Sequence, residues 1–334
     1  MKYSIKDNSR CGVIGYGTWA TALVYTLQKN GKDIWWHIRN EEVLESVITD
    51  GHNAKYLSDV ELNREKIVAT ADINEVVRNC EIILIAAPSA YLKDFLKELT
   101  EPLDGKFILS ATKGIIPEDY TTITEFFNHT YGIPYDCLGL ISGPSHAEEV
   151  SRNRLSYLTV ATKNPDNGKL IAEMFATDSV KISLSSDIYG IEYAGILKNI
   201  YALASGLCSG LGYGDNFRAV LTSACAMEMT RYIQESYPFE RSTLNYAYLG
   251  DLLVTSYSSF SRNRRLGQMI GRGCTVKSAL NEMTMVAEGY FAAACMHHIN
   301  ERYGISMPIA DMVYDILYRR ANPRKRMRML TELL

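Results

Sequence analysis

The sequence lacks any apolar run that approaches the roughly 18 residues needed to span a membrane, because even its most apolar segments contain Lys, Glu or Asn. It also lacks the long apolar stretch of a signal peptide, since its start, MKYSIKDNSRCGVIG, is polar before a short strand-like run. We therefore expect no membrane span and a cytoplasmic location.

Cysteine and histidine are present, but not at the spacing of a metal site. The seven cysteines include no C-x-x-C pair, and His297 and His298 are adjacent, so they point to different sides of a helix. An odd number of cysteines is typical of reduced thiols, which usually pack as small hydrophobic side chains. We expect no metal site.

A strong charge of either sign is absent as well. The formal net charge is -3, which provides no overall attraction to nucleic acid and favours a small-molecule partner. The basic C-terminal segment, Arg319 and Arg320 followed by PRKRMRML, is an exception. Met327, Met329 and Leu330 give this segment an apolar side, so we expect a charged surface helix and no binding of nucleic acid.

The chain has 334 residues, which exceeds the usual length of a domain with a single hydrophobic core. Its first half alternates β-rich runs with helical patterns, and the runs are CGVIG, DIWWHI, EIILIAA, KFILSAT and CLGLISG. This alternation predicts βαβ units and a doubly wound parallel sheet. The β signals stop near Ser186 and long helical patterns follow. We predict an α/β domain over 1–187 and a helical substrate-binding domain over 188–334, with the boundary near Asp187.

A glycine-rich turn follows the first strand run, at Gly15-Tyr16-Gly17-Thr18-Trp19-Ala20, and opens a helix expected over 18–30. In this motif Gly15 permits the tight turn, Gly17 lets the backbone approach a pyrophosphate, and Ala20 allows close packing of the helix on the sheet. The free N–H groups at the helix start would face the phosphates. A plain strand-to-helix turn is the alternative. The motif indicates a Rossmann-like, NAD(P)-binding first domain.

The second strand run should end near Arg39, about 20 residues beyond the glycines, where an acid would accept hydrogen bonds from the adenosine ribose. No acid is present there. Arg39 would suit the 2′-phosphate of NADP, but Glu41 and Glu42 follow closely and a solvated Arg is the alternative. The pattern leans toward NADP and leaves NAD open.

Two lysines occupy unusual places. Lys198 lies in the middle of a helix, 188–206, that is apolar around nearly its whole circumference. Burial would lower the pKa of this lysine toward the range useful for proton transfer, although its side chain could instead extend to the surface. Lys113 follows the strand run KFILS directly, a position that suits a substrate-facing cation or a solvated loop lysine.

Three further segments carry polar groups that would suit a ligand-binding site. The segment 141–147, ISGPSHA, places small residues and a hydroxyl after a strand run, as a simple turn also would. Asp251 lies in an LGDL segment of the helical half. Arg262 and Asn263 combine a bidentate cation with a neutral donor, which predicts a phosphate clamp, with a solvated basic helix end as the alternative.

Taken together, these motifs resemble the bacterial NAD(P)-dependent sn-glycerol-3-phosphate dehydrogenase family along almost the entire chain. The matching segments are GYGTWATAL, ATKG, ISGPSHAEE, AGILKNIYALASG, GLGYGDN, LGDLLVT, SRNRRLG, AEGY and MPIADMVYDILY. The resemblance implies hydride transfer between NAD(P)H and the dihydroxyacetone phosphate/sn-glycerol 3-phosphate pair, with Lys198 as general acid/base. It also implies a role in supplying glycerol phosphate for phospholipid synthesis and a homodimer.

The same resemblance implies the residues of both binding sites. The substrate would be contacted by Lys113, Gly143, Ser145, Asp251, Ser261, Arg262 and Asn263. The cofactor would be contacted by Gly15, Gly17, Thr18, Trp19, Arg39, Lys113, Ala147, Arg262, Val286 and Glu288.

The sequence departs from the family pattern at the edges of these sites. Ile38 replaces a second basic residue after the second strand, and Ala224 stands where the family commonly has an arginine. The usual polar run before S-R-N reads Tyr257-Ser258-Ser259-Phe260, and His146 stands within G-P-S-H-A, where the family has G-P-T-F-A. We expect altered kinetics and retained activity.

Two alternative functions are open. A catalytically weakened relative could bind NAD(P)H as a redox sensor, but such a protein would not need Lys113, Lys198, Asp251 and the Arg262-Asn263 pair together. A ketopantoate or hydroxyacid reductase would share the two-domain plan, but its substrate offers a carboxylate in place of the phosphate that the predicted clamp favours.

Overall fold

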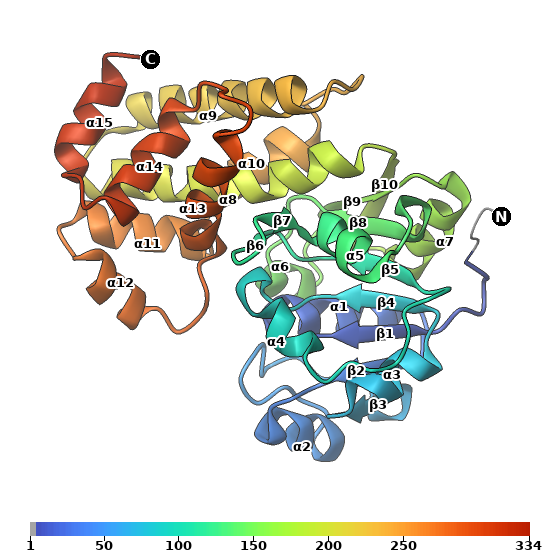
Figure 1. Ribbon diagram of the computed structural model, residues 1–334. Coiled ribbons are helices and arrows are strands. Elements are labelled where there is room, and N and C mark those ends of the chain that lie inside the picture. Colours follow the sequence, from blue (N-terminus) through green and yellow to red (C-terminus); the bar gives the residue numbers. More distant parts are fainter. Residues whose placement is uncertain (1–4) are drawn as a thin grey trace. The chain divides into compact units, whose positions relative to one another are not determined.

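The computed structural model describes residues 5–334, and residues 1–4 of the predicted first domain lie outside this range. The chain divides into two compact units, shown in Figure 1. The first unit contains the described chain up to Thr112 together with Ile123–Ile188, and the second contains Lys113–Thr122 and Tyr189–Leu334. The short segment Lys113–Thr122 thus belongs to the second unit. A single domain boundary near Asp187 would assign this segment to the first unit instead.

The first unit is built on one sheet, which over residues 5–334 has eight strands in the order β10-β9-β8-β5-β4-β1-β2-β3. The strands are β1 (Cys11–Ile14), β2 (Ile34–His37), β3 (Ile67–Thr70), β4 (Ile82–Ile85), β5 (Phe107–Ser110), β8 (Leu138–Ser142), β9 (Ser156–Thr162) and β10 (Val180–Ser185). All pairs from β3 to β8 are parallel. The spatial order 3-2-1-4-5-8 is that of a Rossmann fold, so the predicted fold class is confirmed.

The sheet is not parallel throughout, because β9 pairs with β8 in the antiparallel direction and β10 runs parallel to β9. Between β8 and β9 the chain forms only the five-residue helix α6 (Ala147–Ser151). This short connection returns β9 beside β8, whereas parallel neighbours need a longer crossover.

Burial explains which strands the sequence revealed. Every residue of β1 and β4 is buried, so these central strands appear as continuous apolar runs. The edge strands β3 and β10 are largely half-buried or exposed, and they were not among the runs named from the sequence. The buried strand β9 was not named either.

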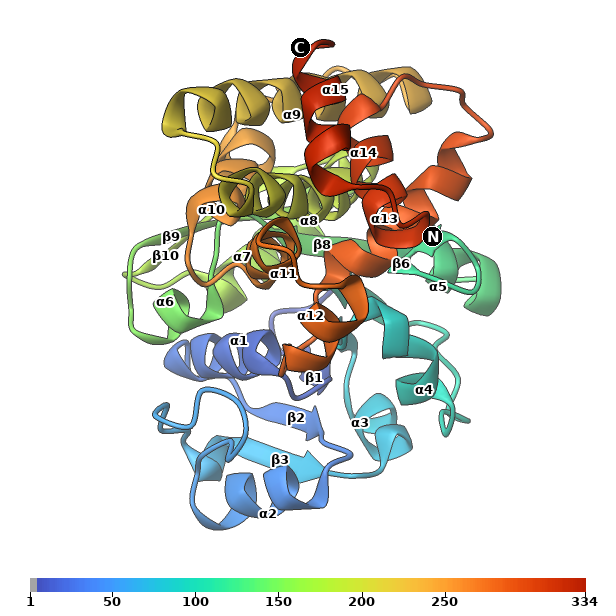
Figure 2. The same cartoon turned by 90° about the vertical axis from the view of Figure 1, so that its left-hand side faces the viewer.

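Helices cover both faces of the sheet, and α1, α6 and α7 lie on one face with α3, α4 and α5 on the other (Figure 2). The helices are α1 (Thr18–Lys29), α2 (Glu41–Thr49), α3 (Ile73–Asn79), α4 (Leu92–Leu96), α5 (Ile123–Tyr131) and α7 (Pro165–Phe175), besides α6. Side-chain caps stabilise the first turns of several helices. Asn40 accepts a hydrogen bond from the Val43 N–H at the start of α2, and Asn164 caps α7, whose first residue is Pro165.

The second unit is helical. Its elements are the hairpin β6 (Ile115–Ile116) and β7 (Thr121–Thr122), and the helices α8 (Ile188–Gly210), α9 (Asp215–Ser236), α10 (Asp251–Tyr257), α11 (Arg262–Gly271), α12 (Val276–Glu282), α13 (Glu288–Asn300), α14 (Pro308–Tyr318) and α15 (Pro323–Thr331). From Ile191 to Cys208, α8 is buried on all sides, as its apolar sequence predicted. Between Ile5 and Leu334 no helix combines the length and apolarity that a membrane crossing requires.

Glycines bring α8 and α11 into direct backbone contact. A Cβ atom on Gly206 would lie 2.0 Å from the carbonyl oxygen of Arg264, and one on Gly267 would lie 2.1 Å from the carbonyl oxygen of Leu203. Side chains at these positions would force the helices apart. The close crossing fixes the start of α11, which carries Arg262 and Asn263, relative to α8, which carries Lys198.

Candidate active site

The turn after β1 requires glycine at its first position. Gly15 has a φ of +116°, and a Cβ atom there would lie 2.6 Å from the carbonyl carbon of Ala86 at the end of β4. The indole Nε1 of Trp36 donates a 2.7 Å hydrogen bond to the Gly15 carbonyl oxygen. The turn is therefore held rigidly at the carboxyl ends of β1 and β4.

Gly17, in contrast, faces open space. Its φ is -75°, and a Cβ atom there would meet no protein atom within 4 Å. No side chain caps the start of α1, and its first turn has no acidic residue. Asn53 steadies the turn by donating to the Tyr16 carbonyl oxygen and to Thr21 Oγ1. A helix start with uncapped N–H groups and free space fits the pyrophosphate of a dinucleotide.

Two other candidate cofactor residues lie at the start of α1. Thr18 is buried with 6% of its surface exposed. Trp19 Nε1 is buried and, within residues 5–334, donates no hydrogen bond. A buried N–H without a partner is uncommon in folded proteins, and it provides a donor for a bound polar group.

Arg39 supplies the positive charge expected after β2. Its Nη1 donates to the Asp94 carbonyl oxygen at 2.9 Å, and its guanidinium carbon lies 3.7 Å from the Phe95 ring centroid. His37 adds no charge near neutral pH, because burial, with a smaller effect from Arg39, lowers its pKa to about 4. Ile38, which replaces the family's second basic residue, is fully buried in the core.

The remaining candidates of the first unit lie around the end of β8. Gly143 has a φ of +125°, and a Cβ atom there would lie 2.7 Å from the Tyr157 carbonyl oxygen, so this position also requires glycine. Ser145 Oγ donates to the Gly143 carbonyl oxygen at 3.0 Å. Ala147 is buried at the start of α6. The other substrate candidates belong to the second unit.

In the second unit, two lysines share one buried carboxylate. Lys198 is 7% exposed and Asp251 only 1%. Lys198 Nζ lies 2.5 Å from Asp251 Oδ1 and 3.0 Å from Thr255 Oγ1, while Lys113 Nζ lies 2.9 Å from Asp251 Oδ2. A π-helical turn, Tyr246–Gly250, leads directly into Asp251 at the start of α10. The side chain of Lys198 therefore stays inside the unit and does not extend to the surface.

Burial tunes the proton affinity of this cluster. Desolvation lowers the pKa of Lys198 to about 7, an effect that the carboxylate of Asp251 opposes and the charge of Lys113 reinforces. For Asp251 burial acts to raise the pKa, but the two lysines outweigh it and hold the pKa below its ordinary value. Near neutral pH the cluster thus combines an ionised Asp251 with a Lys198 that can both give and take a proton.

A chain of amide hydrogen bonds connects the lysine cluster to α11 and α13. Asn199 Nδ2 donates to the Lys113 carbonyl oxygen at 2.8 Å, and Asn263 Nδ2 donates to Asn199 Oδ1 at 2.9 Å. The Gly289 N–H then donates to Asn263 Oδ1 at 2.9 Å. A Cβ atom on Gly289 would lie 2.4 Å from the Asn199 carbonyl oxygen, so only glycine permits this approach. We call Asn199, Asn263 and Gly289 the amide relay.

The other predicted residues of this unit lie close to the relay residues in the chain. Ser261 caps α11 by accepting from the Arg264 N–H, and Arg262 is the first residue of that helix. Val286 lies between α12 and α13, and Glu288 is the first residue of α13. The structure therefore brings Lys113, Lys198, Asp251 and Asn263 into one network.

Asn199 and Thr255 belong to this network but were not singled out from the sequence. Asn199 directly follows Lys198, and Thr255 lies one helical turn after Asp251, within the AGILKN and LGDLLVT segments already noted. Their places next to Lys198 and one turn from Asp251 were the sequence signal that could have identified them as site residues. Among residues 5–334, no group of His, Cys, Asp and Glu side chains is arranged to hold a metal ion.

Comparison with known proteins identifies the family. Residues 10–168 match the family described as NAD-dependent glycerol-3-phosphate dehydrogenase N-terminus, and residues 187–328 match the corresponding C-terminus. The chain is 34% identical over 313 residues to glycerol-3-phosphate dehydrogenase [NAD(P)+] of Staphylococcus carnosus (strain TM300), covering 93% of this chain and 94% of the relative.

Comparison with solved structures supports the same family. The crystal structure of glycerol-3-phosphate dehydrogenase from Coxiella burnetii aligns with a TM-score of 0.90 and 27% identity over 98% of this chain and 100% of that one. A ketopantoate reductase from Ralstonia eutropha, covering 95% of this chain and 99% of that one, reaches a TM-score of 0.60 at 14% identity, which shows a shared fold alone. The chain belongs to the NAD(P)-dependent glycerol-3-phosphate dehydrogenase family.

Proposed function

We propose that this protein interconverts dihydroxyacetone phosphate and sn-glycerol 3-phosphate with NAD(P)H, and that Lys198 is its general acid/base. The observation that carries the proposal is the buried Lys198–Asp251 pair, 2.5 Å apart, in which the pKa of Lys198 falls to about 7. A lysine with that pKa is matched to proton transfer near neutral pH.

In ketone reduction the residues of the lysine cluster would have separate roles. A bound nicotinamide would supply the hydride for ketone reduction and would accept it in the reverse direction. Lys198 Nζ, when protonated, stabilises the negative charge that grows on the carbonyl oxygen and donates the proton that completes the hydroxyl. Asp251 orients this ammonium, and Lys113, on the other carboxylate oxygen, adds a second positive charge. In the reverse direction neutral Lys198 takes the proton from the hydroxyl.

The cofactor would be held by the turn after β1, where the open space at Gly17 and the uncapped start of α1 suit a pyrophosphate. Thr18, Trp19, Ala147, Val286 and Glu288 complete the proposed contacts. Arg39, stacked on Phe95, suits a 2′-phosphate and so favours NADP, while the absence of a second basic residue at Ile38 leaves NAD as the alternative.

The substrate phosphate would be held by Arg262 and Asn263, at the start of α11. Asn263 uses its Oδ1 and one N–H within the amide relay, which leaves its second N–H for a ligand. The family resemblance adds Ser261, together with Gly143 and Ser145 of the first unit. A phosphate clamp explains why a phosphorylated substrate would be preferred over a carboxylate such as ketopantoate.

We also propose a homodimer, formed through exposed apolar side chains of α9 and α10. Val220 and Met227 on α9 are 49% and 68% exposed, and Leu253 and Tyr257 on α10 are 40% and 44% exposed. Tyr257 also contacts α9, since its OH lies 3.4 Å from Thr222 Oγ1. Apolar side chains gathered on a surface commonly mark a protein interface.

The family resemblance further supports three proposals: a cytoplasmic location, a supply of glycerol phosphate for phospholipid synthesis, and a division of labour between a cofactor-binding part, 1–187, and a substrate-binding part, 188–334. The last of these is modified by the grouping of Lys113–Thr122 with the helical unit.

The decisive experiment is the oxidation of NADH and NADPH, measured separately, with dihydroxyacetone phosphate as acceptor and ketopantoate as the control. We expect turnover with the phosphorylated ketone and little with ketopantoate. Faster turnover of ketopantoate would indicate a different reductase. Tight NAD(P)H binding without turnover of either ketone would indicate a redox sensor.

A further inference from the structure

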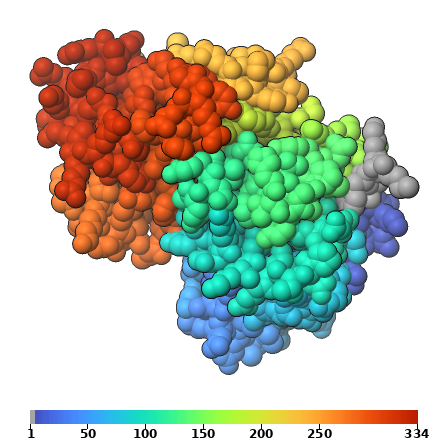
Figure 3. Space-filling view, viewed as in Figure 1, coloured from blue at the N-terminus to red at the C-terminus, as the bar shows by residue number. Residues whose placement is uncertain are grey.

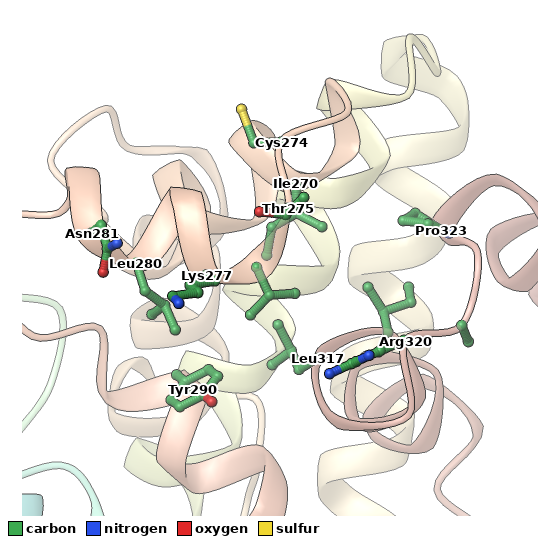
Figure 4. A pocket seen from close by; sticks show the side chains of 13 residues that line it. Ile270, Cys274, Thr275, Lys277, Leu280, Asn281, Tyr290, Leu317, Arg320 and Pro323 are labelled. Carbon is green, nitrogen blue, oxygen red and sulfur yellow. The ribbon is translucent and has the colours of Figure 1, made fainter.

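The helical unit contains a cavity apart from the lysine cluster. It has a volume of about 650 Å³ and is lined by residues of α11, α12, α13 and α14 and of the segment that leads into α15 (Figure 4). Ile270, Leu280 and Leu317 give it an apolar wall. Its volume lies within the range of roughly 300–1,000 Å³ that small-molecule sites occupy. The helices α14 and α15, in red in Figure 3, lie at the surface of the unit.

The charge of the lining is entirely positive. Lys277 and Arg320 line the cavity, and no Asp or Glu does. Within residues 5–334 neither of these two side chains forms an ion pair, whereas the neighbouring Arg319 and Arg326 both pair with Asp315. Two unpaired cations beside an apolar wall are complementary to a ligand with an apolar body and an anionic group.

Arg320 adopts a backbone conformation that usually belongs to glycine. It follows the end of α14 with a φ of +55°, while the N–H groups of Arg319 and Ala321 both donate to the Asp315 carbonyl oxygen. Glycine is the usual residue at this position of a helix end, because other residues pay a steric penalty there. Figure 4 shows the Arg320 guanidinium directed toward the Tyr290 side of the cavity. A strained position that supplies a cation to a cavity is typical of a binding function.

We propose that this cavity binds an amphipathic organic anion, with its apolar body against Ile270, Leu280 and Leu317 and its carboxylate or phosphate facing Lys277 and Arg320. The hydroxyl-bearing Thr275 and Tyr290 are further polar residues of the lining and can orient the head group.

The cavity is placed to regulate the proposed reaction, an inference that rests on the proposed function. α11 carries Ile270 near one end and Asn263 at the other. Tyr290 directly follows Gly289, whose N–H donates to Asn263. A ligand in the cavity therefore contacts both helices that meet in the amide relay, and it alters substrate affinity by shifting or fixing them.

Direct binding tests the site without reference to catalysis. Isothermal titration calorimetry compares decanoate, decyl phosphate and decanol, which share one chain and differ in their head groups. We expect decanol to bind at least about 10-fold more weakly than the better of the two anions, because losing one charge-assisted hydrogen bond lowers affinity by about that factor. The ranking of carboxylate against phosphate identifies the preferred head group. Equal binding of decanol and both anions, or no binding of either anion, overturns the site.

Variants separate the cavity from general electrostatics. The double variant Lys277→Gln with Arg320→Gln should lose anion binding, while Arg324→Gln, a cation of α15 outside the lining, should retain it. Arg320→Gly should also lose affinity. It removes the steric penalty and should therefore melt at a higher temperature than the parent, which would exclude damage to the fold as the cause of the lost affinity. Undiminished binding in the double variant contradicts the proposal.

Cys274 offers a second readout, because it lines the cavity and is exposed while the other cysteines are buried. The bound anion should slow its alkylation by iodoacetamide in the parent and not in the double variant. An unchanged alkylation rate under saturating ligand contradicts the site.

Regulation is tested by the KM for dihydroxyacetone phosphate at saturating anion, which should change in the parent and not in the double variant. An unchanged KM rejects the regulatory role and leaves the calorimetric result standing. Absence of any turnover with this ketone, with or without anion, would instead reject the proposed function.

Discussion

Lys198 and Asp251 form a buried ion pair inside the helical unit, with 2.5 Å between Nζ and Oδ1. The second carboxylate oxygen of Asp251 lies 2.9 Å from Lys113 Nζ. One carboxylate thus compensates two ammonium groups, and the cluster keeps an excess of positive charge whenever Lys198 is protonated. This arrangement suits a reaction in which negative charge develops on a bound phosphorylated ketone.

Replacing Lys198 with Ala removes the proposed proton donor. Since positioned acid–base catalysis is worth about 10² to 10⁴ in rate, we expect kcat for ketone reduction to fall at least about 100-fold. Cofactor affinity, followed by the fluorescence of bound NADH or NADPH, should be retained, because the turn after β1, where we propose that the nucleotide binds, lies in the first unit. Turnover equal to that of the parent would remove Lys198 from the mechanism.

The direction of the Lys198 pKa shift predicts opposite pH profiles for the two reaction directions. Burial lowers this pKa to about 7, so the ammonium form is lost as the pH rises through that value. Ketone reduction, which needs the ammonium, should slow above about pH 7, and glycerol phosphate oxidation, which needs the free amine, should accelerate.

Asp251→Asn tests the source of that pKa, because the carboxylate favours the ammonium form of Lys198. Its removal should move the midpoint of the reduction profile at least about one unit to lower pH. Thr255→Val is the matched control, since it removes a neutral partner of Lys198 and retains the charge. Identical profiles of Asp251→Asn and the parent would show that the pair does not set the kinetic pKa.

Arg262→Ala should weaken substrate binding more than catalysis. Loss of a charged hydrogen bond of about 1.5–3 kcal/mol corresponds to a rise in KM of roughly 10- to 100-fold for the phosphorylated substrate. The variant should also discriminate less against unphosphorylated glycerol in the oxidation direction. Arg265→Ala, an exposed cation of the same helix, serves as the control. Equal use of glycerol and its phosphate by the parent would count against a phosphate clamp.

Gly17→Ala and Gly15→Ala should separate cofactor binding from folding. A methyl group on Gly17 meets no protein atom within 4 Å and needs no change in φ, so Gly17→Ala should fold normally. It should bind cofactor at least about 10-fold more weakly, because the methyl group would fill the space that we propose for the pyrophosphate. A methyl group on Gly15 would lie 2.6 Å from the Ala86 backbone at positive φ, so Gly15→Ala should lower the free energy of unfolding by about 1–3 kcal/mol. Thermal melting and nucleotide titration of both variants provide the comparison, and unimpaired nucleotide binding by Gly17→Ala would place the pyrophosphate elsewhere.

Much of the fold could be predicted because its signals are local. The runs CGVIG and EIILIAA are apolar throughout because β1 and β4 are buried on both faces, and the all-round apolar sequence of α8 reflects its central place in the helical unit. The strands β3 and β10 were missed because edge strands bury only part of their surface. The reversal of β9 was not visible either, since strand direction depends on the path of the connection and leaves no local pattern.

The sequence by itself determined the glycine turn, the isolated lysine in an apolar helix and the order of the motifs, because backbone conformation and burial limit which residues can occupy such positions. Only the tertiary structure decided that Lys113, distant in sequence, joins Lys198 on the carboxylate of Asp251, and that Asn263 is bound to Asn199 and Gly289. Those contacts depend on the close crossing of α8 and α11 and on hydrogen bonds between segments far apart in the chain. The sequence specifies which ionisable side chains are present, whereas the lowered pKa of Lys198 arises from the low-dielectric surroundings that packing creates.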